Sequence, residues 1–250
     1  MYSTDLTNTQ WQFIKSSLNI NERKRKHDLR EIWNAINYLV KTGCQWRMLP
    51  SSFPKWQLVY YYYSKWSSEE LFDLLLEKLR HKVRVKLRQN SNASLGIMDS
   101  QTVRWGINKS LSSFDGNKKI KGIKRHVIVD KNGFLIAVMA TVAHIHDSKA
   151  ALLLMRVIKA FLCSIKVIIA DGGYRGGLAE EIKTKFGYTM RVVMRKNNTE
   201  FEPVNKRWVI ERTFSWFDND RRLCRNYEML LETSETMVKL SAIKLLLNKI

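Results

Sequence analysis

Three carboxylates stand where the hydropathy pattern otherwise favours buried apolar side chains. Asp99 follows the apolar run 95–98, and Asp171 follows the apolar run 167–170. Glu211 lies in an amphipathic stretch closer to the C-terminal end. A carboxylate at the end of a buried strand loses hydration unless positive charge faces it, and a divalent cation supplies such charge. The three acids are therefore candidate metal ligands.

Such a set of acids would support metal-assisted phosphoryl transfer. If the strands that end near Asp99 and Asp171 are neighbours, their carboxylates can share a cation at one edge of the sheet. Two hard cations activate a water or a 3′-hydroxyl and stabilise the leaving oxygen; Mg²⁺ prefers oxygen ligands, and Mn²⁺ can substitute. Taken alone, Asp171 followed by Gly172 is more typical of an ordinary turn.

Helical geometry places Glu211 on a polar face. At about 100° per residue, one arc of the expected helix holds the apolar positions and Thr213. The opposite arc holds Arg207, Glu211, Ser215, Asp218 and Arg222. This face permits the acid to reach into a cleft, and it would equally suit a helix on the solvated surface.

The charge balance favours a polyanionic partner. The chain has 43 Lys and Arg against 23 Asp and Glu, a formal net charge of +20, which indicates nucleic acid more than an anionic membrane surface. No apolar run approaches the ~18 residues of a membrane span, and residues 1–5 open no signal peptide. Three widely spaced cysteines suit a reduced compartment, so we expect a cytoplasmic, nucleoid-associated protein with no membrane contact.

A dense basic run precedes the expected hairpin of the second half. Its members are Lys118, Lys119, Lys121, Lys124, Arg125 and His126. Such a run is often only a solvated face, but in a chain this basic we predict that it contacts the phosphate backbone of DNA.

The elements that must position these residues fall into two parts, separated by a polar, turn-rich seam at 89–94. Residues 1–90 are expected to form a helical, helix-turn-helix-like DNA-binding domain. One helix follows a possible N-cap at Asp28 and stops at Gly43. Another, 56–66, carries four consecutive tyrosines at 60–63, which are as consistent with a packing helix as with a face in a DNA groove.

Residues 95–250 predict an α/β domain with a mixed sheet. Strands are expected at 95–103, 124–129, 134–139, 167–170 and 190–194, and helices at 148–161, at 178–186 and from 207 onward. The sequence Asp130-Lys131-Asn132-Gly133 between the second and third strands is a strong hairpin signal.

Several ordered motifs together resemble a known family. They are Thr42–Pro50 (TGCQWRMLP), Asp99–Val103 (DSQTV), Lys121–His126 (KGIKRH), Ala170–Tyr174 (ADGGY) and Trp208–Trp216 (WVIERTFSW). In these stretches, which run almost end to end, the chain resembles bacterial insertion-sequence transposases of the DDE class, most closely those of insertion-sequence family five.

The resemblance implies an RNase H-like catalytic domain preceded by a helical DNA-binding segment. It also implies two Mg²⁺ ions held by Asp99, Asp171 and Glu211, and a homodimer that pairs the two terminal inverted repeats of an element. Water would cleave the DNA at the element's ends, and the freed 3′-hydroxyls would attack target DNA.

The chain departs from a Tyr-Arg-Glu-Lys signature that related families carry around the glutamate. Arg207 occupies the arginine position, but Val204 and Asp218 stand in place of the tyrosine and the lysine. Positive charge near the DNA could instead come from Arg221 and Arg222.

Two other functions remain open from sequence. One is a catalytically silent DNA-binding protein derived from a transposase, which the presence of all three acids disfavours. The other is a stand-alone RNase H-like nuclease, which would leave residues 6–88 without a role.

Overall fold

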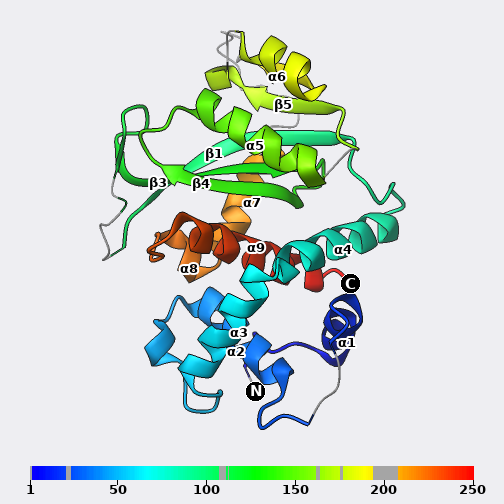
Figure 1. The fold of residues 1–250 in the computed structure, drawn as a ribbon, viewed down its shortest axis with the longest axis vertical. Coiled ribbons are helices and arrows are strands. Elements are labelled where there is room, and N and C mark those ends of the chain that lie inside the picture. The colour runs from blue at the N-terminus through cyan, green and yellow to red at the C-terminus, as the bar shows by residue number, and fades with distance from the viewer. Residues whose placement is uncertain are drawn as a thin grey trace. The chain divides into compact units, whose positions relative to one another are not determined.

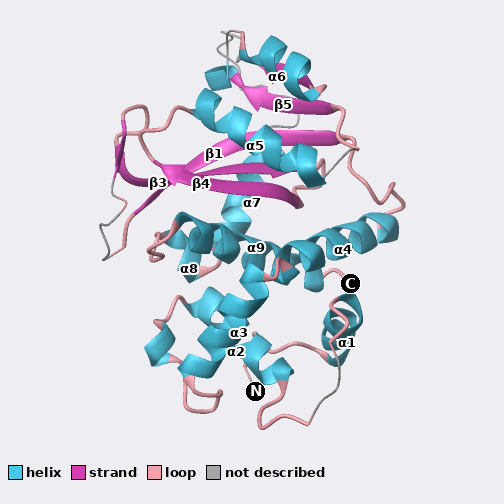
Figure 2. Cartoon of the chain, in the orientation of Figure 1, coloured by secondary structure: helices cyan, strands magenta, loops and turns pink. Residues whose placement is uncertain are grey.

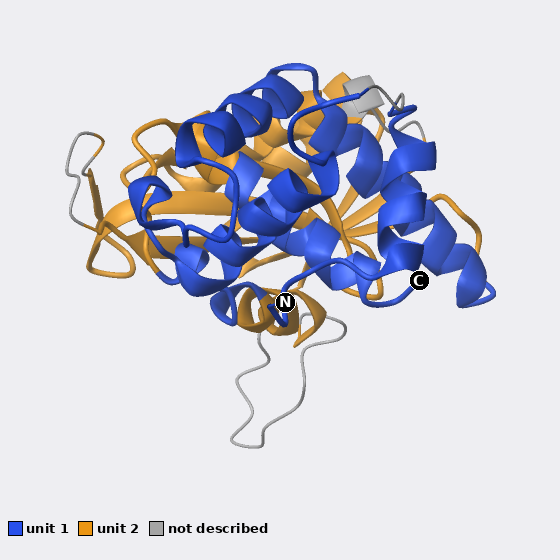
Figure 3. Ribbon diagram, turned by 90° about the horizontal axis from the view of Figure 1, so that it is seen from below, with its two compact units in different colours: residues 1–88, 217–224, 236–250 blue, residues 89–216, 225–235 orange. Residues whose placement is uncertain are grey.

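The chain forms two compact units, which do not follow the two halves of the sequence (Figure 3). The computed structural model describes residues 2–20, 24–106, 111, 113–161, 164–174, 177–193 and 208–250. Unit 1 comprises Met1–Arg88, Phe217–Cys224 and Thr236–Ile250, and unit 2 comprises Gln89–Trp216 and Arg225–Glu235. The break near residue 89 lies at the expected seam, but two C-terminal segments that we expected in the second domain group with the first unit.

Unit 1 is helical within its described residues. Its elements are α1 (Asn8–Ser17), α2 (Leu29–Thr42), the 3₁₀ turn η1 (Trp46–Met48), α3 (Trp56–Ser68), α4 (Leu71–Lys86), α8 (Arg221–Cys224) and most of α9 (Leu231–Leu247). The signals that predict α2 act as expected. The Asp28 side chain accepts a hydrogen bond from the Arg30 amide at 2.9 Å, and Gly43 ends the helix with φ +71°.

The four tyrosines of α3 divide between the core and the surface. Tyr63 is buried and lies 5.0 Å from the ring of Trp46, whereas Tyr60 and Tyr61 are 43% and 57% exposed. Tyr63 therefore fits the packing interpretation, whereas contact with DNA stays a prediction for the exposed Tyr60 and Tyr61.

The C-terminal helices join unit 1 through specific polar contacts. Thr236 at α9 shares a hydrogen bond with Ser67, and Lys239 forms an ion pair with Asp73 at 2.7 Å. Buried Asp220 accepts from Ser241 at 2.6 Å and pairs with Lys244. Within the described ranges, neither the apolar helix α9 nor any other helix is long and apolar enough to cross a membrane.

Unit 2 contains a mixed sheet in the order β2-β3-β1-β5-β6, with β4 also paired to β3 (Figure 2). The strands are β1 (Leu95–Arg104), β2 (Ser113–Asp115), β3 (Ile120–Val129), β4 (Leu135–Val142), β5 (Val167–Asp171) and β6 (Thr189–Val193). β1, β3 and β4 are antiparallel neighbours, and β5 and β6 continue from β1 in parallel. This is the arrangement of an RNase H-like sheet, as predicted.

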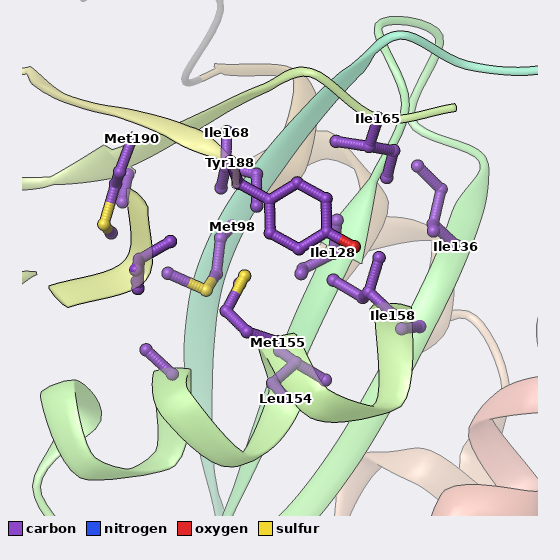
Figure 4. Close-up of a cluster of buried hydrophobic side chains, with 14 of the residues drawn as sticks. Met98, Ile128, Ile136, Leu154, Met155, Ile158, Ile165, Ile168, Tyr188 and Met190 are labelled. Atoms are coloured by element: carbon purple, nitrogen blue, oxygen red, sulfur yellow. The ribbon is translucent and has the colours of Figure 1, made fainter. Parts of the chain in front are cut away.

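Helices α5 (Asp147–Phe161) and α6 (Leu178–Phe186) cover one face of this sheet. Their apolar residues pack with Met98, Ile128 and Ile168 from three different strands (Figure 4). Because side chains alternate along a strand, the neighbours of these residues point to the other face. Figure 1 shows α5 in front of the sheet and α7 (Trp208–Asp218) behind it.

Candidate active site

Asp99 and Asp171 lie on neighbouring parallel strands and point to the same face of the sheet. β1 and β5 are paired up to Ile97 opposite Ile169, and each aspartate stands two residues further along its strand. Two residues restore the same side of a strand, and neighbouring strands are about 4.8 Å apart. The register thus brings the two carboxylates together, on the face opposite to α5.

Asp99 does not end its strand as the apolar run suggested, because β1 continues to Arg104. What ends at Ile97 is the pairing with β5, so Asp99 follows the last paired position. Its carboxylate is partly exposed and accepts a hydrogen bond from the Ser100 amide at 2.7 Å. Asp171 is likewise partly exposed and is the last residue of β5. Both acids are thus placed where a ligand from solvent can reach them.

Glu211 is exposed in the first turn of α7. The predicted faces hold within α7, where Val209, Ile210 and Thr213 are buried and Ser215 and Asp218 are exposed with Glu211. The prediction is wrong for Arg222, which is buried in α8, because α7 ends at Asp218. The acid is therefore accessible to solvent, while the buried face of its helix packs into the protein.

Two hydrogen bonds from α7 hold it against the β3–β4 turn. Thr213 Oγ1 donates to the Gly133 carbonyl at 3.0 Å, and Arg212 Nη2 donates to the Asn132 carbonyl at 2.8 Å. The Arg212 guanidinium also lies between the rings of Trp208 and Trp216, at 4.6 and 4.7 Å from their centroids. Arg212 and Thr213, which directly follow Glu211, thus hold the part of α7 that carries it.

The donor set fits a hard divalent cation, although the three acids are not gathered as one metal site. Among the described residues, no group of three or more His, Cys, Asp or Glu side chains is arranged to hold an ion. Two carboxylates on one face of adjacent strands nevertheless offer the oxygen ligands that Mg²⁺ and Mn²⁺ prefer.

The basic run divides in two. Lys118, Lys119 and Lys121 are exposed at the β2–β3 turn and the start of β3, whereas the other three members are buried. Lys124, Arg125 and His126 are only 3%, 1% and 1% exposed. Burial disfavours the predicted phosphate contact for these three residues, because β3 is an inner strand paired with β1 on one edge and with β4 on the other.

Buried Lys124 and His126 meet polar groups inside unit 2. Lys124 Nζ lies 3.5 Å from Asp115 and 3.4 Å from Asp147, and it donates to the Ile145 carbonyl at 3.0 Å. His126 Nε2 is 2.9 Å from the Thr141 hydroxyl. The polar groups of these two side chains are therefore paired inside unit 2 and are not available to a phosphate.

The remaining predicted DNA contacts differ in accessibility. Arg221 is exposed at the start of α8, but Arg222 is buried and donates to the Cys44 carbonyl at 3.0 Å. Arg207 lies outside the described residues. Arg221 is thus the member of this group that the described structure leaves available to DNA.

Burial makes His126 a neutral side chain with a measurable effect on stability. Burial lowers its pKa to about 4 from the ordinary 6.5; Asp147 opposes this shift, while Lys124 and Lys118 add to it. As pH falls below 6.5, the unfolded chain binds a proton that the folded chain refuses until about pH 4. The free energy of unfolding should therefore fall across this window, by up to about 3 kcal/mol from His126 alone.

Urea unfolding at pH 7, 5.5 and 4.5 measures this effect. His126→Gln keeps a polar group near Thr141 but does not titrate, so its stability should depend less on pH than that of the wild type. The exposed His144→Gln is the matched control and should retain the wild-type slope. Equal slopes in all three proteins would contradict a depressed histidine pKa.

Comparisons with known proteins bear on the same residues. A family model described as a putative transposase of the IS4/5 family matches residues 6–76, and a transposase DDE domain model matches residues 90–234. The second match covers more than half of the chain. The chain belongs to the DDE transposase family. The transposase thus has the enzyme class, divalent-metal dependence and DNA substrate that its family implies.

Individual relatives of the transposase are distant. The "Putative transposase for insertion sequence element IS402" of Burkholderia cepacia is 27% identical over 151 residues, which cover 58% of this chain and 70% of that relative. The solved structure "Cryo-EM structure of piggyBac transposase synaptic complex with hairpin DNA (SNHP)" matches 93% of this chain and 70% of its own, with a TM-score of 0.45 and 11% identity. A structural likeness at this level adds nothing to the family assignment.

Sequence reasoning missed the polar residues behind the acids. Tyr174 ends the 3₁₀ turn η2 (Gly172–Tyr174) and is 1% exposed, and Asp147 begins α5. A tyrosine three residues after a candidate ligand, and an aspartate directly after His146, were the available signals. Neither shows from sequence alone that it faces the interior.

Proposed function

We propose that this transposase binds the terminal inverted repeats of its element, cleaves at their ends and joins the 3′-hydroxyls to target DNA by two-metal phosphoryl transfer. The observation that supports it best is the placement of Asp99 and Asp171 on one face of adjacent parallel strands within a transposase DDE domain. Glu211, on the exposed side of α7, is the third ligand in this proposal.

The carboxylates of Asp99, Asp171 and Glu211 would hold Mg²⁺, or Mn²⁺ in its place. When bound, such ions activate the attacking oxygen and stabilise the leaving oxygen of an in-line displacement. The residues of the chain contribute position. The β1–β5 register holds two carboxylates side by side, and the contacts of Arg212 and Thr213 hold the helix of the third.

Exposed basic residues supply the contacts with DNA in this proposal. Lys118 and Lys119 on the β2–β3 turn, with Lys121 at the start of β3, can neutralise backbone phosphates near the cleavage site. In unit 1, Arg221 and the exposed Tyr60 and Tyr61 are the proposed contacts with repeat DNA. Two copies of the chain would act together as a homodimer on paired repeat ends, at the nucleoid.

The decisive experiment uses the full chain and labelled duplexes that carry either the inverted repeat flanking its gene or a scrambled repeat. We expect nicks that leave 3′-hydroxyls at the repeat end in Mg²⁺ or Mn²⁺, and none in EDTA. Asp99→Asn should bind the repeat normally and lose cleavage.

Three other outcomes would each overturn the proposal. Undiminished nicking by Asp99→Asn would exclude the acid from the site. Repeat binding without cleavage in either metal would identify a silent DNA-binding protein. Cleavage that ignores the repeat sequence would identify a general nuclease.

A further inference from the structure

The β2–β3 hairpin is attached to β1, the strand that carries Asp99, by two hydrogen bonds. The Thr102 hydroxyl donates to Asp115 Oδ2 at 2.6 Å, and Lys118 Nζ donates to the Ser100 carbonyl at 2.8 Å. Ser100 and Thr102 are the first and third residues after Asp99 along β1. The hairpin thus contacts the segment of β1 that directly follows the candidate metal ligand.

Asp115, the last residue of β2, holds the turn from inside unit 2. It is 2% exposed, and its Oδ1 accepts from the amides of Asn117 at 3.0 Å and Lys118 at 3.2 Å. Its other oxygen, which accepts from Thr102, also lies 3.5 Å from Nζ of the buried Lys124. Hydrogen bonds to an ionised carboxylate are stronger than those between neutral groups. The backbone of Lys118 is therefore held in place, and only its side chain has to be ordered for it to reach β1.

The contact of Lys118 falls on the residue that also contacts the Asp99 carboxylate. The Ser100 amide donates to Asp99 Oδ1 at 2.7 Å, and the Ser100 carbonyl is the group that accepts from Lys118. The pairing of β1 with β5 ends at Ile97, so at Ser100 the strand β1 is paired with β3 alone. Lys118 thus stabilises β1 where the parallel pairing has ended.

The same lysine can contact DNA and hold the Ser100 carbonyl at once. Its side chain is exposed, and an ammonium group has three N–H donors, of which one is directed to this carbonyl. A hydrogen bond with a charged donor is about twice as strong as a neutral one. Lys118 therefore differs from a lysine that contributes only its charge to a solvated surface.

We propose that Lys118 is a positioning residue for Asp99: its ammonium holds the Ser100 carbonyl and thereby keeps the Ser100 amide on the Asp99 carboxylate, in the orientation that receives the metal ion. This inference rests on the proposed function, to which it adds a second role for one lysine of the β2–β3 turn. Groups that orient metal ligands generally contribute about 10–100-fold to metal affinity or activity. Lys118 acts through the backbone of Ser100, so we expect the lower end of this range.

The direction of the effect separates positioning from simple electrostatics. Removal of a positive charge near a cation site strengthens binding of the cation, because like charges repel each other. Loss of positioning weakens it. Lys118→Gln removes the charge together with the contact to Ser100, because the glutamine side chain is shorter and neutral. Lys119→Gln is the matched control, since it removes the same charge from the next exposed position of the same turn.

The full chain is titrated with Mn²⁺ in the absence of DNA and followed by electron paramagnetic resonance, which gives both the affinity and the number of bound ions. We expect Lys118→Gln to weaken Mn²⁺ binding about 10-fold with an unchanged number of sites. Lys119→Gln should bind Mn²⁺ at least as tightly as the wild type. Lys118→Arg keeps a charged donor and should stay within about 3-fold of the wild type.

Wild-type or tighter Mn²⁺ binding by Lys118→Gln would overturn the inference, because it would leave Lys118 with the effect of its charge alone. An equal loss in Lys119→Gln would overturn it as well. Partial unfolding is distinguished from both results, since it lowers the number of sites, while the affinity of the folded fraction still decides. A wild-type chain that binds no Mn²⁺ would refute the metal site of the proposed function, whereas undiminished binding by Lys118→Gln refutes this inference alone.

Discussion

Glu211→Gln is expected to lower cleavage of repeat DNA about 10³-fold at saturating Mg²⁺, equivalent to ~4 kcal/mol of transition-state stabilisation. The substitution keeps the length of the side chain and its place on the exposed face of α7, but it replaces a charged oxygen ligand with a neutral amide. Hard cations bind carboxylates far better, and the stabilisation of the leaving oxygen would be lost with the ion.

The contacts of α7 make this result specific to the carboxylate. Arg212 and Thr213 anchor the helix to the β3–β4 turn from residues that Glu211→Gln does not touch, so the helix should stay in place. Asp218→Asn is the matched control, since it makes the same change of charge on the same exposed face two turns later. We expect its cleavage rate to stay within about 3-fold of the wild type.

Single-turnover rates with preformed protein–DNA complexes are the appropriate measurement, because they separate the chemical step from binding. Thermal midpoints of the three proteins should agree within about 2 °C, since exposed substitutions change stability little. A wild-type single-turnover rate for Glu211→Gln would mean that the third ligand lies elsewhere in the chain.

Local signals predicted most elements because short-range physics decides them. The Asp28 cap and Gly43 stop bound α2 in the structure, and helix α6 spans Leu178–Phe186, as expected. The hairpin around residues 130–133 forms because the Asp130 carboxylate accepts from the amides of Asn132 and Phe134 inside the turn. Residues within a few positions of one another carry all of this information.

The same local signals do not determine which side chains are buried. Lys121 and Lys124 look alike in sequence, yet one is exposed and the other is 3% exposed. What makes burial of Lys124 tolerable is a pair of acids, Asp115 and Asp147, that stand 9 and 23 positions away. Such compensation depends on strand pairing, which periodicity alone does not determine.

The grouping of the C-terminal segments with unit 1 was not visible in the sequence for a related reason. α9 is apolar enough to require burial, but its sequence does not show against which unit it packs. Its partners in unit 1, including Ser67 and Asp73, are more than 160 residues away in the chain. The relation between Asp99 and Asp171 followed from the sequence only on the condition that their strands are neighbours, and the pairing of β1 with β5 meets that condition.

Gly122→Ala is the substitution with the largest expected effect on the stability of unit 2. A Cβ at this position would lie 1.9 Å from the backbone oxygen of Val103, far inside van der Waals contact. The clash involves backbone on both sides, so no side-chain rotation relieves it. We expect a loss of about 3 kcal/mol in the free energy of unfolding, at the upper end for an overpacked site.

Gly116→Ala provides the control, since a Cβ there meets nothing within 4 Å. It lies in the turn just before β3 and should change the urea midpoint little. Equal midpoints for the two variants would show that β1 and β3 do not approach closely at Gly122. If the expected loss is found, the close approach explains why glycine stands between Lys121 and Ile123. It lets the pairing of β1 with β3 continue to Arg104 opposite Gly122, and β1 is the strand that carries Asp99.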